Sequence, residues 1–302
     1  MNCCSNAVKR YGKTSAGTQR FHCLACNKTY TWKRSDVSRN NQQHWFKLWI
    51  TESYCIRQLS KLSGHSKSTL ERIKNYWLNQ TPPELSDYSQ YNYLLLDGTY
   101  FHKNGCLIVV MDAITQKVIM SLYTASESYY TVRPMLGRLH DLGLRPKALI
   151  MDGHRMVIRA IREIWPTVII QRCLYHIQRE GSRWLRTHPK TEAGKELQGL
   201  LRYLPKVKNS KRKAQFLHDF SSWLERHESF VRTLPRSTVA YKDLKRTMAL
   251  ITNALPDMFH YLEEPNIHST TNCLESFFSR LKADFRRHRG LSEAHKQSYL
   301  QW

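Results

Sequence analysis

Two apolar runs in the chain each end on an aspartate that is followed by glycine. Asp97 follows three leucines in YLLLDGTYF (93–101), and Asp152 closes the run ALIMDGH (148–154). A carboxylate at the exit of a buried strand is costly unless something compensates its charge. Two such carboxylates placed together could hold a hard divalent cation, which prefers oxygen ligands. The alternative is that each aspartate only begins a turn, because Asp-Gly is itself a strong turn signal.

The other acidic residues are divided between turn formers and candidates for the site. Asp112, in VVMDAITQKVI, is predicted to start the turn of a hairpin, and we leave it outside the site. A third acid must come from further along the chain. Glu275 stands near the start of an amphipathic helix expected over 273–287, and Asp284 is the candidate if Glu275 fails.

The elements that must position these acids predict an α/β fold. Three β-rich runs separated by turns are followed by alternating helices and strands, which indicates a mixed sheet with flanking helices. Residues 174–263 then show only helical periodicity. The expected strands are 93–101, 106–116, 118–126, 148–153 and 167–172, and the expected helices between them are 129–142 and 155–165.

Residues 55–78 have the pattern of two short helices joined by a glycine turn. Ser63-Gly64 breaks the first helix and Ser66 can cap the second, which is typical of a helix-turn-helix. An ordinary helical hairpin is the alternative. The side chains expected to face outward from the second helix, toward a DNA major groove, are Lys67, Ser68, Thr69, Arg72 and Lys74.

The charge of the chain is strongly positive and unevenly distributed. Lysine and arginine number 47 against 24 aspartates and glutamates, a formal net charge of +23. Residues 1–80 carry 14 basic and 3 acidic side chains, 81–176 carry 10 and 8, and 177–250 carry 17 and 7. Such an excess favours a polyanionic partner, because neutralised phosphates release counterions. We therefore expect nucleic acid as the partner and a near-neutral chemical centre between two basic blocks.

No segment predicts a membrane protein or a secreted one. The longest uninterrupted apolar run, CLIVVM (106–111), is far shorter than the about 20 residues of a bilayer span. The N-terminus has cysteines and charges where a signal peptide would be apolar. The 8 cysteines indicate reduced intracellular thiols and one metal cluster. We expect a cytoplasmic protein with no membrane partner.

Several motifs, in order, resemble those of one known family. Asp97, the stretch MDGHRMVIRAIREIWPTVIIQRCLYHIQRE (151–180) and TTNCLES (270–276) closely resemble the DDE transposases of the Mutator-like superfamily, in its bacterial insertion-sequence branch. The resemblance covers roughly residues 91–302. It implies a ribonuclease-H-like catalytic core in which Asp97, Asp152 and Glu275 hold two Mg²⁺ or Mn²⁺ ions.

The same resemblance implies roles for three neighbouring residues. The family carries a Cys-x-x-His after its fourth strand, matched by Cys173 and His176, and an asparagine three residues before the glutamate, matched by Asn272. A zinc site needs four ligands and no second pair is apparent here. We interpret His176 as a catalytic neighbour that donates to a phosphate oxygen or positions the Asp152 region, supported by Cys173 and Asn272. A packed core cysteine and a surface histidine are the alternative.

The N-terminal cysteines are similar to those of the zinc ribbons that open many insertion-sequence transposases. Cys23 and Cys26 have the spacing of a zinc knuckle. Aligning Ser5 with the Gly-Ser of such ribbons makes Cys3 the second ligand and places the first before Met1. Either Cys4 substitutes for that ligand, or the chain begins downstream of its natural start. An unliganded remnant is the alternative.

Together these features predict four parts. A zinc-ribbon-like module (1–35) and a helix-turn-helix (36–80) precede a catalytic domain made of residues 91–176 and 266–302. An all-helical insertion (177–265) interrupts that domain, and its positive charge suits it either to cover DNA or to form a structural lid.

The expected function is that of a DNA transposase of a bacterial insertion sequence, associated with the nucleoid. It would bind terminal inverted repeats and target DNA, cleave and transfer strands, and act as a homodimer or larger assembly. The alternatives are a non-catalytic DNA-binding regulator derived from a transposase, and a ribonuclease-H-like nuclease.

Overall fold

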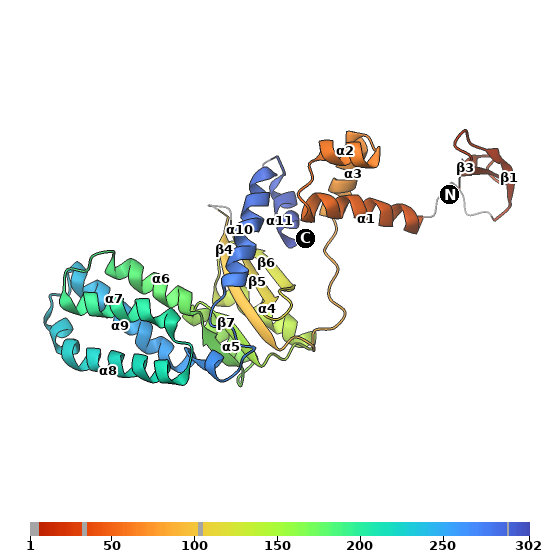
Figure 1. The fold of residues 1–302 in the computed structure, drawn as a ribbon. Coiled ribbons are helices and arrows are strands. Elements are labelled where there is room, and N and C mark those ends of the chain that lie inside the picture. Colours follow the sequence, from red (N-terminus) through yellow and green to blue (C-terminus); the bar gives the residue numbers. More distant parts are fainter. Residues whose placement is uncertain (1–5, 32–34, 102–104, 289) are drawn as a thin grey trace. The chain divides into compact units, whose positions relative to one another are not determined.

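The chain divides into two compact units, Met1–Thr81 with Trp302 and Pro82–Gln301 (Figure 1). The computed structural model describes residues 6–31, 35–101, 105–288 and 290–302. The division falls at a pair of prolines, Pro82 and Pro83, which cannot continue the helix that ends shortly before them.

A mixed five-stranded sheet forms the centre of the second unit, with the strand order β6-β5-β4-β7-β8. The first three strands along the chain pair antiparallel, whereas β7 and β8 extend the sheet in parallel. The strands are β4 (Tyr93–Tyr100), β5 (Cys106–Asp112), β6 (Val118–Thr124), β7 (Ala148–Met151) and β8 (Ile169–Arg172).

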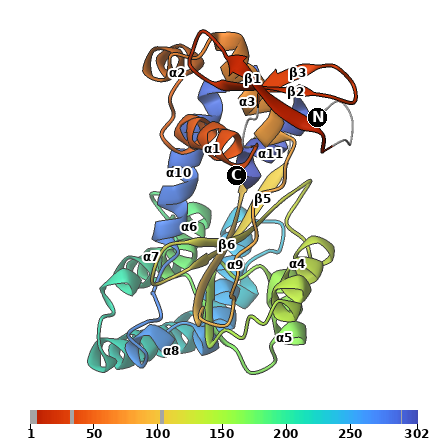
Figure 2. The ribbon, with the colours of Figure 1, turned by 90° about the vertical axis from the view of Figure 1, so that its right-hand side faces the viewer.

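Helices cover both faces of this sheet. Helices α4 (Tyr129–Asp141) and α5 (Arg155–Ile164) lie along one face, and α10 (Asn272–Arg287) runs along the other (Figure 2). Every residue of β5 is buried, as expected for a continuous apolar strand covered on both sides. The core between the sheet and its first two helices includes Leu96, Ile108 and Leu136, none more than 1% exposed.

The structure confirms the order of the expected elements and corrects one placement. Asp97 lies inside β4, paired with Val109, and not at the end of the strand. Pairing of β4 with β7 stops at Leu95, but pairing with β5 continues to Tyr100. Asp97 therefore lies two residues beyond the last β4 residue paired with β7, in the part of β4 that pairs only with β5.

Asp112 begins a turn, as predicted. Its Oδ2 accepts hydrogen bonds from the backbone N–H and the hydroxyl of Thr115, both at 2.7 Å. This is the turn chemistry expected of an aspartate at the start of a hairpin loop.

Residues between β8 and α10 form a separate helical layer with its own core. Phe216, Trp223 and Ile251 are fully buried there, and the Trp223 Nε1–H donates to the Ala193 carbonyl at 2.9 Å. The layer consists of α6 (Leu174–Leu185), α7 (Glu192–Tyr203), α8 (Ser210–Thr233) and α9 (Val239–Ala254), with short 3₁₀ helices η2 (Leu204–Lys206), η3 (Leu255–Asp257) and η4 (His260–Leu262). The C-terminal helix α11 (Glu293–Gln301) follows α10.

The first unit contains a small antiparallel sheet of order β1-β2-β3 and three helices. Gly64 ends α2 in the left-handed conformation (φ 69°), and the Ser66 hydroxyl caps α3, both as the sequence predicts. The elements are β1 (Val8–Lys13), β2 (Gln19–Cys23), β3 (Thr29–Thr31), α1 (Ser35–Thr51), α2 (Ile56–Ser63) and α3 (Lys67–Leu78).

Among the residues described, no helix is both long enough and apolar enough to span a lipid bilayer.

Candidate active site

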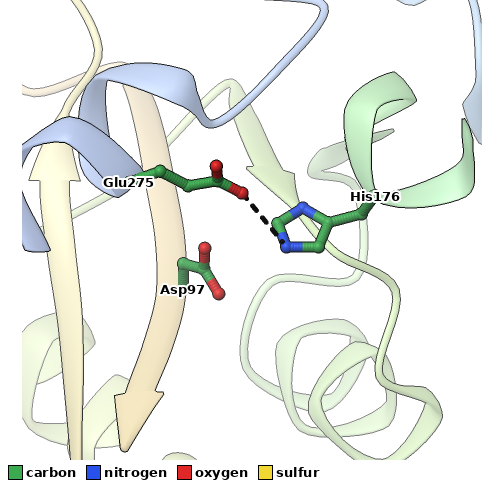
Figure 3. Close-up of side chains that lie close together, drawn as sticks. All are labelled: Asp97, His176 and Glu275. Atoms are coloured by element: carbon green, nitrogen blue, oxygen red, sulfur yellow. Dashed lines mark ion pairs between the residues drawn. The ribbon is translucent and has the colours of Figure 1, made fainter. Parts of the chain in front are cut away.

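Three side chains from three different elements converge beside the sheet. Asp97 comes from β4, His176 from the first turn of α6 and Glu275 from the first turn of α10 (Figure 3). Each offers a ligand atom, and these atoms all lie within 4.8 Å of one another. His176 Nε2 is 3.4 Å from Glu275 Oε1. Two of the three predicted acids are thus brought together, with the predicted histidine beside them.

Asp97 is strongly disfavoured as an anion. The residue is 9% exposed, and burial raises the pKa of its carboxyl to about 8, with repulsion from Asp152, Glu127 and Glu275 adding to the shift. A hydrogen bond from the Gly98 N–H to Asp97 Oδ1 (2.8 Å) opposes this only in part. The protein therefore does not compensate the charge of an ionised Asp97, and without a cation this carboxyl is mostly protonated at pH 7.

Asp152 belongs to the same electrostatic environment but not to the cluster of three. It directly follows β7, as predicted, and its Oδ1 accepts the His154 N–H at 2.8 Å. It is the nearby charge with the largest effect on the pKa of Asp97. The structure thus places the second predicted acid close enough to act on the first.

A buried arginine fixes the backbone at Asp152. Arg172, 7% exposed, donates from Nε to the Asp152 carbonyl at 2.9 Å. Its guanidinium lies over Gly153, where a Cβ would come within 2.0 Å of it, and Gly153 has φ +112°. The positive φ favours glycine at this position, and any side chain there would also require the Arg172 guanidinium to move.

Glu127 is a fourth carboxylate that sequence reasoning missed. Burial raises its pKa to about 7, with repulsion from Asp152 as the second cause. Its Oε2 lies 2.6 Å from where a Cβ of Gly98 would be, so it lies against the residue next to Asp97. Its only sequence signal is an acid beside a helix N-terminus, which is ordinary for helix starts. Nothing in the pattern separates it from such residues.

His176 does not neutralise Glu275. Burial, and then the positive charge of Arg179, lower the pKa of the imidazole, so it is neutral at pH 7. The 3.4 Å contact between the two side chains is therefore no ion pair under these conditions. The Arg179 Nη1 lies 3.9 Å from Glu275 Oε1, an oxygen that is buried and accepts no hydrogen bond from the described residues.

This set of donors fits a hard divalent cation. Asp97 and Glu275 supply carboxylate oxygens, of which Glu275 Oε1 lacks a hydrogen-bond donor among the described residues, and Asp152 adds negative charge beside them. Imidazole suits softer metals better than Mg²⁺, so His176 would lie beside such an ion without being one of its preferred ligands.

The two supporting residues take different positions. Cys173 is fully buried directly before α6, and Asn272 is exposed as the first residue of α10, one turn before Glu275.

In the first unit, the residues expected to contact DNA do not all face outward. Lys67, Ser68 and Arg72 are exposed, and Thr69 is half-buried. Lys74 is a correction, because its side chain is only 15% exposed, pairs with Glu71 and lies 5.7 Å from the ring centre of Trp49. Its position on α3 points it toward α1, where its alkyl stem covers apolar surface.

The N-terminal cysteines are described only in part. Cys23 ends β2 and is buried, and Cys26 lies half-buried in the tight turn that follows, where the Asn27 N–H donates to the Cys23 carbonyl. Cys3 and Cys4 lie outside the described residues. The predicted zinc site therefore stays a prediction.

Comparison with known proteins finds one family. The family described as Transposase, Mutator family, matches residues 49–289. Similar solved structures include the Drosophila P element transposase strand transfer complex, 12% identical over 92% of this chain and 80% of that chain, with a TM-score of 0.33. Another is the simian T-cell lymphotropic virus intasome in complex with PP2A regulatory subunit B56 gamma, 14% identical over 68% of each chain, with a TM-score of 0.23. No curated protein sequence matches the chain.

The raised pKa values predict that the metal-free protein loses stability as the pH rises. Asp97 and Glu127 bind protons more tightly when folded than unfolded, so their contribution is complete below about pH 4 and is lost as the pH passes through about 7 and 8. Melting with EDTA should therefore show the Tm falling by several degrees between pH 7 and 9, since 1 kcal/mol corresponds to about 2–4 °C for a domain of this size.

Asp97→Asn should flatten this pH dependence, and Asp112→Asn should leave it unchanged. Mg²⁺ or Mn²⁺ should raise the Tm more at pH 8.5 than at pH 6. A metal-free Tm that is constant or rises from pH 7 to 9 would contradict the electrostatic description of the site.

Proposed function

Because the chain belongs to the Mutator family of transposases, we propose that it is the DNA transposase of a bacterial insertion sequence. Its site would cleave DNA strands at the element ends and join them to target DNA. The observation that carries the proposal is the convergence of Asp97 and Glu275, with Asp152 nearby, in a site that does not compensate the charge of an ionised Asp97. Such a site suits metal-dependent displacement at phosphorus.

The topology supports a ribonuclease-H-like core. Three antiparallel strands followed by two parallel ones, in the order β6-β5-β4-β7-β8, place the central strand β4 between the hairpin and the parallel pair. Asp97 on β4 and Asp152 after β7 therefore come from neighbouring strands, and α10 brings Glu275 across the opposite face from α4 and α5.

We assign Asp97, Asp152 and Glu275 as the residues that would hold two Mg²⁺ or Mn²⁺ ions. When bound, such ions activate the attacking oxygen and stabilise the leaving oxygen of an in-line displacement. The attacking group is water during cleavage of an element end and a DNA 3′-hydroxyl during strand transfer. No covalent intermediate with the protein is required.

The protein's own groups supply position and polarity. The Gly98 N–H orients Asp97, and Arg172 holds the backbone at Asp152. His176 is neutral, with Nε2 toward Glu275 and a buried Nδ1 that has no hydrogen-bond partner among the described residues. An imidazole in that state can orient Glu275 or donate to a phosphate oxygen, and it adds no positive charge to compete with a cation.

We assign DNA binding to the two basic blocks. The first unit would recognise terminal inverted repeats through its small sheet and through α3, where Lys67, Ser68 and Arg72 are exposed. Residues 177–250, with 17 basic and 7 acidic side chains, would cover DNA near the active site. Because two element ends must meet, we expect a homodimer or larger assembly.

The three acids give the decisive test. Asp97→Asn, Asp152→Asn and Glu275→Gln should each abolish Mg²⁺-dependent nicking of element-end DNA while leaving DNA affinity within about twofold, because each keeps the side-chain volume and removes a charge. Asp112→Asn is the matched control and should keep activity, since an asparagine can also serve a turn.

Each outcome of this assay has a clear meaning. Binding of element ends without nicking by the wild-type protein would favour the regulator, and cleavage that ignores the terminal repeats would favour a nuclease. A Glu275→Gln variant that still cleaves would move the third acid to Asp284.

The exposed face of α3 should bind DNA electrostatically. Lys67→Ala and Arg72→Ala should each weaken binding and make the slope of log K against log salt shallower by about 0.9 for each phosphate that is no longer neutralised, as counterion release predicts. Fluorescence anisotropy over a series of salt concentrations measures both effects. Lys74→Ala is the control and should leave the salt slope unchanged, because its ammonium group is paired with Glu71. Unchanged slopes for all three variants would contradict this placement of the DNA.

We propose that Zn²⁺ binds Cys23 and Cys26, with Cys3 and Cys4 supplying the other two thiolates. Cys23→Ser should then release zinc and unfold the small sheet while leaving the melting of the second unit unchanged, because metal binding supplies most of the stability of such a module. Metal analysis by mass spectrometry of the wild-type protein tests this directly. Less than one equivalent of any metal would identify the module as a remnant.

A further inference from the structure

One sulfur atom joins two helices that carry active-site residues. Cys173 directly precedes α6, Thr271 directly precedes α10, and neither side chain is exposed. The backbone N–H of Thr271 donates to Cys173 Sγ at 3.3 Å, and the Thr271 hydroxyl donates to the same sulfur at 3.4 Å. Residues 98 positions apart in sequence are thus linked by two hydrogen bonds to one atom.

Backbone hydrogen bonds extend this link to both sides of the site. The Cys173 N–H donates to the carbonyl of Met151, the residue before Asp152, at 2.7 Å. The Leu174 N–H donates to the Ser269 carbonyl at 3.0 Å. On the other side, the Thr271 carbonyl accepts the N–H of Glu275 at 3.1 Å. A continuous series of hydrogen bonds therefore connects the backbone beside Asp152 with the backbone of Glu275.

The Thr271 side chain does not cap its own helix, because its hydroxyl bonds to the Cys173 sulfur. A threonine at the N-cap position normally accepts a hydrogen bond from an amide in the first turn of its own helix. Thr271 makes no such bond, and its hydroxyl is directed to the thiol of Cys173. A local stabilising interaction is thus replaced by one that fixes where α10 begins.

The Cys-x-x-His spacing does not form a metal-binding pair here. The sulfur of Cys173 faces Thr271 in the interior, whereas His176 Nε2 faces Glu275 in the site. The two side chains therefore have different partners: Cys173 bonds to Thr271 in the interior, and His176 faces the carboxylates of the site.

We propose that Cys173 is a positioning residue whose thiol fixes the start of α10 against the start of α6, and so holds Glu275 opposite His176 and Asp97. His176 is three residues after Cys173 and Glu275 is four residues after Thr271. A shift at this Cys173–Thr271 joint is therefore transmitted through about one rigid helical turn on each side. The meaning of that geometry for catalysis rests on the transposase function proposed above.

The test compares variants of the full-length protein that remove the joint with variants that keep it. Cys173→Ala removes the acceptor, and Thr271→Val removes the hydroxyl donor while keeping the shape. Both should lower kcat for nicking by about 10- to 100-fold, because a displacement of about 1 Å at a catalytic group costs on this order. The KM for DNA should stay within about twofold. Cys173→Ser keeps a small acceptor and should restore most of kcat, and the double variant should be little worse than either single one.

A second measurement does not depend on metal or activity. Hydrogen exchange of peptides covering residues 268–280 should be faster in Cys173→Ala and Thr271→Val, because the amides of Leu274 and Glu275 bond to the Thr271 carbonyl. Ile177→Val is the matched control, since the Ile177 side chain is buried on the same helix and the substitution keeps its backbone hydrogen bond to the Cys173 carbonyl. It should lower the Tm slightly without changing exchange over 268–280 or kcat.

The outcomes separate the two proposals. If Cys173→Ala and Thr271→Val resemble Ile177→Val in both exchange and kcat, the joint has no positioning role and the inference is wrong. If exchange rises as expected but the wild-type protein never cleaves DNA, the joint stands and the transposase function fails. If kcat falls while exchange over 268–280 is unchanged, Cys173 acts by another route and the inference is overturned.

Discussion

Acidic side chains held close together beside the central strand β4 are the constraint on which the second unit depends. Asp97 lies inside a strand, almost closed to water, within the fields of Asp152, Glu127 and Glu275. Folding must hold these groups together against repulsion and desolvation. The burial of apolar side chains between the sheet and helices α4 and α5, and within the helical layer, supplies the opposing free energy. The repulsion that disfavours the metal-free fold is what would give a divalent cation affinity for the proposed site.

The chain opposes this repulsion with hydrogen bonds that fix the backbone next to each acidic residue. The Gly98 N–H holds Asp97, the Arg172 guanidinium holds the carbonyl at Asp152, and the thiol of Cys173 holds the start of α10. The helical layer between β8 and α10 also keeps the backbone next to the acids in place. It leaves the sheet after Cys173 and returns at Ser269, where the Leu174 N–H donates to the Ser269 carbonyl, so its length does not disturb Glu275.

The proposed activity needs the near-neutral block that contains this site as well as the two basic blocks on either side of it. A near-neutral block that contains two of the three acids suits a site where metal ions must bridge carboxylates and phosphate, since nearby lysines would compete for the same carboxylates. The flanking basic blocks suit sequence-independent attraction to the phosphate backbone. Lys74 shows that not every basic side chain serves this purpose, because its stem and charge are used within the first unit.

The sequence by itself determined the elements and their order, because apolar periodicity, turn residues and caps act over a few neighbours. The helices at 129–142, 155–165 and 273–287, the turn at Asp112 and the cap at Ser66 all follow from such local physics. Only the tertiary structure decided that Asp97 lies within β4, that Glu127 joins the carboxylates, and that Cys173 bonds Thr271. These depend on strand pairing, desolvation and contacts between distant residues, which local periodicity and turn signals do not determine.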